Sequence, residues 1–352
     1  MVQPAASVKK VQAETLYELE FVGAPQLSPC GQKVAYIQTV INQEKNYESH
    51  LFIYDRQTGE SVQWTNGASK DSSPKWSSDG KWIAFVSNRS GKNQIWKISS
   101  IGGEAKQVTH LKNGASTPVW HPHKQAFLFT TSLKEDETLQ AKEGDEEKEE
   151  LQPLVVDDIR YKGDGIGFLD GRKSQIGFYD LENEQMNLLT SEPYNHKDPA
   201  WSPDGEAIAY VRTSEDEPGA YSLQDLLVKP LGKEAYKVNQ ESGVFNVPNW
   251  SPNGEAISYL GHNREYDGAT LNRVWMVSLQ TQEHTCLTKD VDLECSDVLI
   301  SDLHWDNPTQ GAVWDQSGQG LYVLGTERGN TAIYQIDLSG NVSKVLEGER
   351  HI

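Results

Sequence analysis

A short pattern of apolar and polar positions recurs along the chain. An apolar residue is followed by a polar turn, and the turn by a run in which nearly every position is apolar. The pattern is clearest at residues 76–86, 201–211 and 250–260, where Trp-Ser, a tight-turn sequence and Gly precede runs such as Ile-Ala-Tyr-Val. Pro, Asp or Asn, and Gly suit the backbone angles of a turn. Successive apolar positions suit a strand buried on both faces. Each copy therefore predicts a β-hairpin.

Weaker copies begin at residues 27, 120 and 314, so six hairpins are expected. After a hairpin comes a third apolar strand, as at 94–98, and then a fourth that ends near Thr, as at 62–65. Four antiparallel strands per unit and a repeat of forty to fifty residues indicate an all-β fold, a β-propeller.

The repeat divides the chain into expected units. Residues 1–23 form an N-terminal lead with a short helix at 11–22, whose apolar side needs cover from the propeller rim or from another domain. The propeller follows, with its longest insertion in blade three and a long excursion in blade five that includes 289–311. Its six blades are expected at about 24–68, 69–114, 115–194, 195–243, 244–298 and 299–352.

The insertion in blade three begins with an acidic run. Residues 134–150 hold nine acidic residues and three lysines, too few apolar side chains to order the segment, so we expect a mobile and dispensable loop. A glycine-rich stretch follows. Because propeller insertions gather on one face, which is often the binding face, Arg160, Tyr161 and Asp164 are candidates for a loop that meets a peptide or a hydrolase domain.

The alternative is a structural role for Arg160, in which it pairs with Asp157 or Asp158 and holds the loop in place. A Ca²⁺ site formed by Asp157, Asp158, Asp164 and Asp170 is a weaker alternative than a solvated acidic loop.

Other motifs for catalysis or cofactor binding are missing from the sequence. There is no Gly-x-Ser-x-Gly, Walker A, His-Glu-x-x-His or EF-hand sequence. The glycines at 163–167 miss the dinucleotide-binding spacing. His121 and His123 have a spacing that suits a metal, but they replace turn residues of the repeat, so a degenerate turn is the better interpretation. No catalytic, cofactor or metal residue is therefore assigned.

Composition narrows the choice of partner and compartment. A net charge of −19 argues against nucleic acid and anionic membranes. The three cysteines form no Cys-x-x-Cys, which favours free thiols. With no apolar leader or membrane-length run, we expect a cytoplasmic protein. The repeated tryptophans are expected in the blade cores, and Arg89 is expected to tie down a loop.

The repeat unit, Trp-Ser-Pro-Asp-Gly followed by an apolar strand and later by Leu-Thr, is similar to the TolB-type propeller repeat. The order of the irregular features is more specific than the repeat. Together they resemble the N-terminal propeller of the prolyl oligopeptidase family of serine peptidases, in its acylaminoacyl-peptidase-like bacterial branch. The irregular segments lie at residues 13–17, 42–44, 160–165, 269–272 and 297–300.

This resemblance implies a propeller of about seven blades that covers a C-terminal α/β-hydrolase domain and admits short peptides to it. Only six repeats are visible here, and no residue matches the family's catalytic motif. We therefore expect a gating propeller without its hydrolase domain, inactive alone. A free-standing interaction propeller of the TolB or WD40 kind is the first alternative. A propeller enzyme with its own site at the channel mouth is the second.

Overall fold

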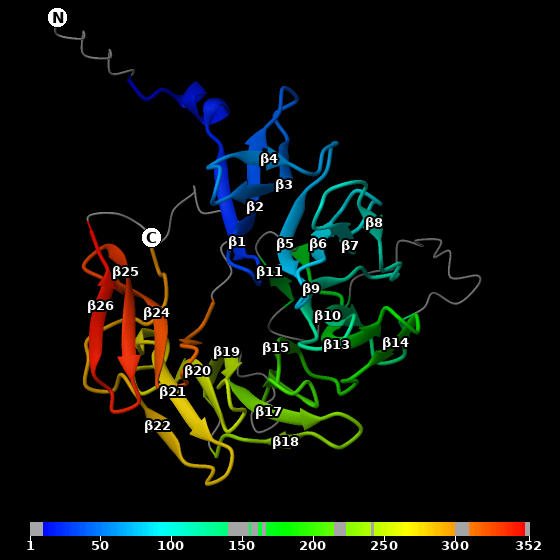
Figure 1. Cartoon of the computed structure of the whole chain (residues 1–352). Coiled ribbons are helices and arrows are strands. Elements are labelled where there is room, and N and C mark those ends of the chain that lie inside the picture. Colours follow the sequence, from blue (N-terminus) through cyan, green and yellow to red (C-terminus); the bar gives the residue numbers. More distant parts are fainter. Residues whose placement is uncertain are drawn as a thin grey trace, which may run out of the picture.

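The computed structural model describes residues 10–139, 155, 161–163, 167–214, 223–240, 243–299 and 310–348. Six four-stranded antiparallel sheets lie around a common centre, and they follow one another in chain order (Figure 1). In every sheet the strands are hydrogen-bonded to their neighbours in sequence order. The prediction of an all-β propeller with four-stranded blades is confirmed.

The blades are built from the following strands. The first three hold β1 (Phe21–Leu27), β2 (Lys33–Ile41), β3 (Tyr47–Asp55) and β4 (Ser61–Gln63); β5 (Asp71–Trp76), β6 (Trp82–Ser87), β7 (Gln94–Ser99) and β8 (Lys106–Gln107); and β9 (Ser116–Trp120), β10 (Ala126–Leu133), β13 (Lys173–Asp180) and β14 (Gln185–Leu188). The last three hold β15 (His196–Trp201), β16 (Ala207–Thr213), β17 (Gln224–Pro230) and β18 (Tyr236–Lys237); β19 (Val244–Trp250), β20 (Ala256–His262), β21 (Arg273–Ser278) and β22 (His284–Cys286); and β23 (Val313–Trp314), β24 (Gly320–Glu327), β25 (Asn330–Asp337) and β26 (Val342–Leu346).

The expected helix at 11–22 is wrong in type and extent. The structure has a 3-10 helix, η1 (Ala13–Glu18), and the chain is already in strand β1 from Phe21. Phe21 is buried and Val22 is 60% exposed, which is the alternation of a strand rather than the face of a helix. Pairing with β2 therefore overrides the helical pattern, and the first blade begins before the expected boundary.

The repeated tryptophan joins each blade to the preceding one. The indole N–H of Trp76 donates to the carbonyl of Gln26 at 3.1 Å, and that of Trp120 to Lys75 at 2.9 Å. The acceptor each time is the residue just before the equivalent position in the preceding blade. The same bond links Trp201 to Val119, Trp250 to Ala200, and Trp314 to Asn249. The packing role expected of these tryptophans is confirmed.

Each hydrophobic core lies between two blades. One core, for example, combines Ala35 and Ile37 of blade one with Ile83 and Phe85 of blade two. Strands of adjacent blades pack together from blade one to blade six. Among the described strands, those of blade six and blade one share no extensive packing.

The turn of blade three shows how histidine replaces the usual turn residues. In blade two, Ser77 Oγ accepts the N–H of Trp82 at 3.0 Å and donates to Asp79 at 2.7 Å. In blade three, His121 Nδ1 accepts the N–H groups of His123 and Lys124 at 3.0 and 3.1 Å. Its Nε2 donates to the Gly205 carbonyl of the next blade at 3.1 Å. The interpretation as a degenerate turn is confirmed.

The innermost strands of blades one to five share a backbone irregularity. Three positions before the tryptophan position, a residue other than glycine adopts a positive φ, and the pairing register with the second strand shifts there. This β-bulge bends the strand and increases its twist. The residues are Ala24, Ser73, Thr117, Asp198 and Val247.

Candidate functional site

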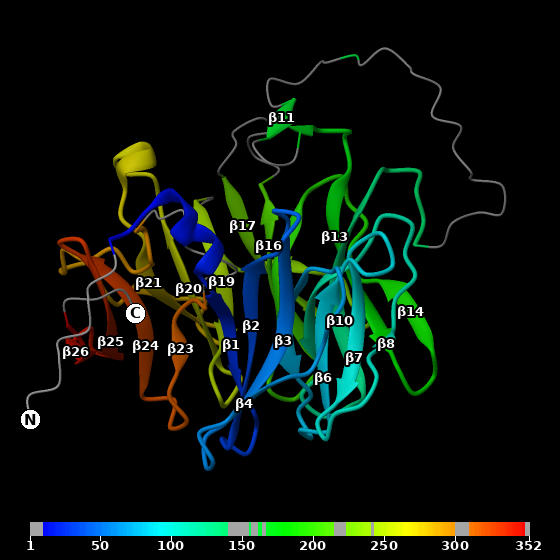
Figure 2. The same ribbon diagram turned by 90° about the horizontal axis from the view of Figure 1, so that it is seen from above.

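Three segments that do not belong to the repeat project from one face of the propeller (Figure 2). These are η1, the short 3-10 helix η2 (Asp267–Ala269), and a hairpin of β11 (Lys162–Gly163) and β12 (Gly167–Phe168). We call this side the insertion face. In Figure 1 the hairpin lies toward the middle of the propeller, so the insertion of blade three returns over the face from which it leaves.

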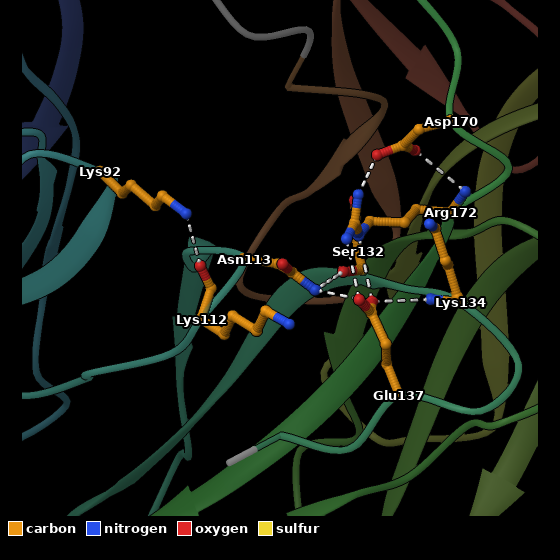
Figure 3. A network of polar contacts seen from close by, with 8 residues as sticks. All are labelled: Lys92, Lys112, Asn113, Ser132, Lys134, Glu137, Asp170 and Arg172. Carbon is orange, nitrogen blue, oxygen red and sulfur yellow. Dashed lines mark hydrogen bonds and ion pairs between the residues drawn. The ribbon is translucent and has the colours of Figure 1, made fainter. Parts of the chain in front are cut away.

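A polar clamp joins the two ends of this insertion (Figure 3). Arg172, on the returning end, donates from Nε and one terminal nitrogen to the two carboxylate oxygens of Glu137, at 3.0 and 2.8 Å. Its other terminal nitrogen pairs with Asp170. Glu137, on the departing end, also accepts from Asn113 Nδ2 at 2.9 Å and from the backbone N–H of Lys134 at 3.0 Å. The clamp therefore gathers three segments around one carboxylate.

The electrostatics of Glu137 show how strongly its charged form is favoured. The Arg172 hydrogen bonds, with smaller contributions from the Lys134 N–H and Asn113, lower its pKa to about 2, against the opposing effect of partial burial. Two-pronged arginine–carboxylate pairing of this kind fixes geometry as well as contributing energy. The clamp thus sets where the insertion leaves and rejoins the blade.

Part of the expected loop at 134–150 is ordered. Residues 134–139 belong to the described chain, and Glu137 is bound in the clamp, so the expectation that the whole run is mobile is wrong for its first residues. That the run is dispensable stays a prediction. The physical reason is that Glu137 has a specific partner 35 residues along the chain. Residues 140–150 lie outside the described residues.

The base of the β11–β12 hairpin exposes an apolar surface. Tyr161 is 47% exposed and stacks on Phe168, which is 61% exposed, with ring centroids 6.2 Å apart. The carbonyl of Tyr161 accepts the N–H of Leu169 at 2.8 Å, which closes the hairpin base. Of the candidate residues, Tyr161 is therefore placed on the insertion face. Arg160 and Asp164 lie outside the described residues, as do Asp157 and Asp158.

Sequence reasoning missed Glu137, Phe168 and Arg172. Glu137 is one of many acids in its run, and Arg172 is an isolated arginine after a turn, so their pairing follows only from the fold. Phe168 offered a signal, since it is an aromatic residue beside a glycine-rich segment, like Tyr161.

Arg89 has the structural role expected of it. Its guanidinium donates to both oxygens of the buried Asp71 at 2.8 Å and to Ser87 Oγ at 2.9 Å. It also lies 5.0 Å from the centre of the Trp96 ring. In the described parts of the chain, no group of three or more His, Cys, Asp or Glu side chains is placed to hold a metal ion.

Comparison with known proteins finds similar sequences and similar structures. Residues 6–156 match the family model described as the TolB beta propeller domain. The chain is 36% identical over 345 residues to an uncharacterized peptidase, YuxL, of Bacillus subtilis, a match that covers 97% of the chain and 52% of that relative. It is 24% identical over 359 residues to dipeptidyl-peptidase 5 of Porphyromonas gingivalis, covering 96% of the chain and 49% of the relative.

A solved structure, the acylaminoacyl peptidase of Pyrococcus horikoshii, superposes with a TM-score of 0.72 at 21% identity. The match covers 96% of this chain and 48% of that one, and it shows a shared fold. The chain spans about half the length of the curated relatives named here. Within the described residues, no helix has the length and apolar character needed to cross a membrane.

Proposed function

The chain is a TolB-type β-propeller of the kind found in peptidases of the prolyl oligopeptidase family, and from this premise we propose that it is the substrate-admitting half of a serine peptidase. In this role it covers an α/β-hydrolase domain of the same polypeptide and passes short peptides to it. Folded proteins are excluded by size. The chemistry, a serine nucleophile activated by histidine and an oxyanion hole, belongs to the hydrolase half.

The observation that carries this proposal is the 36% identity to a peptidase across 97% of the chain. The match includes the irregular segments as well as the repeats, so it reaches beyond what the repeat itself requires. The insertion face adds structural support. Segments outside the repeat gather there, and a clamped insertion presents two stacked aromatic rings. Loops held by a rigid scaffold are where propellers bind their partners.

Tyr161 is assigned a contact with the peptide or with the hydrolase half in this proposal, and Arg160 and Asp164 flank it in sequence. The match of residues 6–156 to the TolB model is the observation that favours the rival role, a free-standing interaction propeller.

A chimera separates the two roles. This chain replaces the matching half of the Bacillus subtilis relative, and hydrolysis of acetyl-peptide p-nitroanilides is compared with that by the parent. The peptidase role predicts a folded chimera that turns over these substrates. A chimera whose serine reacts with a fluorophosphonate probe but which binds and cleaves no peptide would instead favour the interaction propeller.

A further inference from the structure

A polar recess opens between blades one and two on the insertion face. It has a volume of about 680 Å³ and is lined by the turn between β2 and β3, at residues 42–48, and by residues 68–70 and Asn88 of blade two. Lys45, in that turn, lies with its ammonium 5.9 Å from the centre of the Tyr17 ring of η1. The recess is therefore on the same side of the propeller as the helix and the hairpin.

The blade-two wall of the recess carries one buried hydrogen-bond donor without a partner, the Ser69 hydroxyl, and two more accessible donors beside it, on Asn88 and Lys70. Ser69 is only 4% exposed, and its hydroxyl has no hydrogen-bond partner. Asn88 uses Oδ1 to accept the backbone N–H of Lys70 at 2.8 Å, which fixes the amide and leaves Nδ2 to donate. Among the described residues, neither this Nδ2 nor the Lys70 ammonium has a partner. The buried Ser69 hydroxyl without a partner calls for an explanation. An anion bound between it, the partly exposed Asn88 amide and the exposed Lys70 side chain accepts hydrogen bonds from all three.

The opposite wall is held rigid. Asn42 Oδ1 accepts the N–H groups of Glu44 and Asn46, both at 2.9 Å, and its Nδ2 donates to Glu48 at 2.8 Å. Glu48 is thus already engaged, and Glu44 and Lys45 stand at the tip of the turn. A preformed wall reduces the ordering cost of binding.

The charges of the two walls select the kind of anion. Lys45 and Lys70 balance Glu44 and Glu48, so the recess has no net charge within a chain of −19. A doubly charged phosphate would meet the two acids across the recess, whereas a singly charged carboxylate is matched by the Lys70 ammonium. The amide side chains of Gln43 and Asn46 on the other wall suit the main-chain groups that precede a peptide carboxylate.

We infer that the wall formed by Ser69, Lys70 and Asn88 binds the free C-terminal carboxylate of a short peptide. This inference rests on the proposed function and deepens it, because a propeller that holds the far end of its substrate selects peptides by length as well as by excluding folded proteins.

Calorimetric titration of the 352-residue chain tests this. The probe is acetyl-Ala-Ala-Phe, either with a free C-terminal carboxylate or amidated. We expect the amide to bind about tenfold more weakly, as befits loss of one charge-assisted hydrogen bond. Lys70→Gln should weaken binding of the free acid by a similar factor and leave the amide unaffected. Ser69→Ala should weaken it less. Lys124→Gln, at an exposed lysine in the turn between β9 and β10 of blade three, is the matched control and should change nothing.

Equal affinity for acid and amide, or unaltered binding by Lys70→Gln, would overturn the assignment. Two further results would overturn it: tighter binding of inorganic phosphate than of the peptide with a free carboxylate, or no binding of either peptide. Acetyl-Ala-Glu-Phe amide separates a C-terminal carboxylate from a side-chain one, and its binding as tightly as the free acid would also contradict the inference. Any of these results leaves the chimera's peptide hydrolysis untouched, so failure here is distinguishable from failure of the proposed function.

Discussion

Trp201 shows how a single residue holds two blades together. Its indole is 9% exposed, donates to Val119 of the preceding blade at 3.2 Å, and packs edge-on against Phe178 with ring centroids 5.9 Å apart. The side chain therefore contributes buried area and a hydrogen bond at one interface between blades.

Trp201→Ala should lower the free energy of unfolding by about 3–5 kcal/mol, the usual range for truncating a buried large aromatic residue. Trp201→Phe should cost less, since it keeps most of the apolar area and loses the hydrogen bond. Urea denaturation measures both. The control is Tyr266→Ala, at a tyrosine that is 68% exposed, where a change within about 0.5 kcal/mol is expected. A loss below about 1 kcal/mol for Trp201→Ala would place the side chain outside the blade core.

Glu137 is the residue whose titration should be visible in stability. Its pKa is about 2 in the folded chain, below the ordinary value of 4.5. A lowered folded-state pKa stabilises the fold above the unfolded-state pKa, and this contribution is lost as the pH falls through the folded-state pKa. The stabilisation should therefore be complete above about pH 5 and should decline toward pH 2.

The measurement is the melting temperature of the parent and of Glu137→Gln across this pH range. The parent should be the more stable at pH 7, and the difference should shrink as the pH falls below 4.5 toward 2. Glu135→Gln, at a neighbouring exposed acid, is the control for loss of a surface carboxylate. A difference in melting temperature between parent and variant that is constant with pH would mean that the charge of Glu137 does not stabilise the fold through Arg172.

Some features at the residue scale follow from sequence and others do not. The tryptophans and the turn glycines recur at fixed places, so their roles can be predicted. The positive φ of the inner strands falls on Ala24, Ser73, Thr117, Asp198 and Val247. These share no side-chain property, and Val247 is β-branched, so only the geometry of packing around a centre specifies the bulge.

At the scale of elements, the insertion of blade three has a base that is fixed by hydrogen bonds and ion pairs, and it carries the β11–β12 hairpin. Arg172, Asp170 and Glu137 fix the base of the insertion, and Tyr161 and Phe168 stack at the start and end of the β11–β12 hairpin. The acidic composition at 134–150 predicted a loop, but composition does not reveal that one of its nine acids has a distant arginine partner.

Replacing residues 140–150 with a Gly/Ser linker of the same length should leave the melting temperature nearly unchanged, because the segment has too little apolar surface to offset its ordering entropy. Replacing 134–150, which also removes Glu137, should lower it. Differential scanning calorimetry of the two variants compares them directly. A large fall for the shorter replacement would show that the acidic segment docks on the propeller.

The N-terminal segment shows where local pattern fails. Residues 11–22 fit a helical period, yet Phe21 and Val22 pair with Thr39 and Gln38 of β2. The pairing partner lies close in space only once the blade forms, so a window along the chain cannot include it. The strands of the repeat were predictable because each hairpin has its turn signal beside it, whereas β11 and β12 were not predicted.

At the scale of the whole molecule, six repeats give six blades, and the segments outside the repeat share one face. The fold follows from the sequence because each blade is specified locally and each interface repeats the preceding one. The gathering of η1, the β2–β3 turn and the β11–β12 hairpin on one face gives the propeller a working side, and this side is where the proposed function places the peptide.

The length dependence of peptide hydrolysis tests the central claim, that this propeller admits and selects peptides for a hydrolase half. The chimera with the remaining half of the Bacillus subtilis relative and that half alone are compared on acetyl-peptides of increasing length and on an unfolded and a folded protein. The account predicts that the chimera prefers short peptides by kcat/KM and does not cleave the folded protein, while the half alone discriminates less. The same length profile with and without the propeller would contradict it.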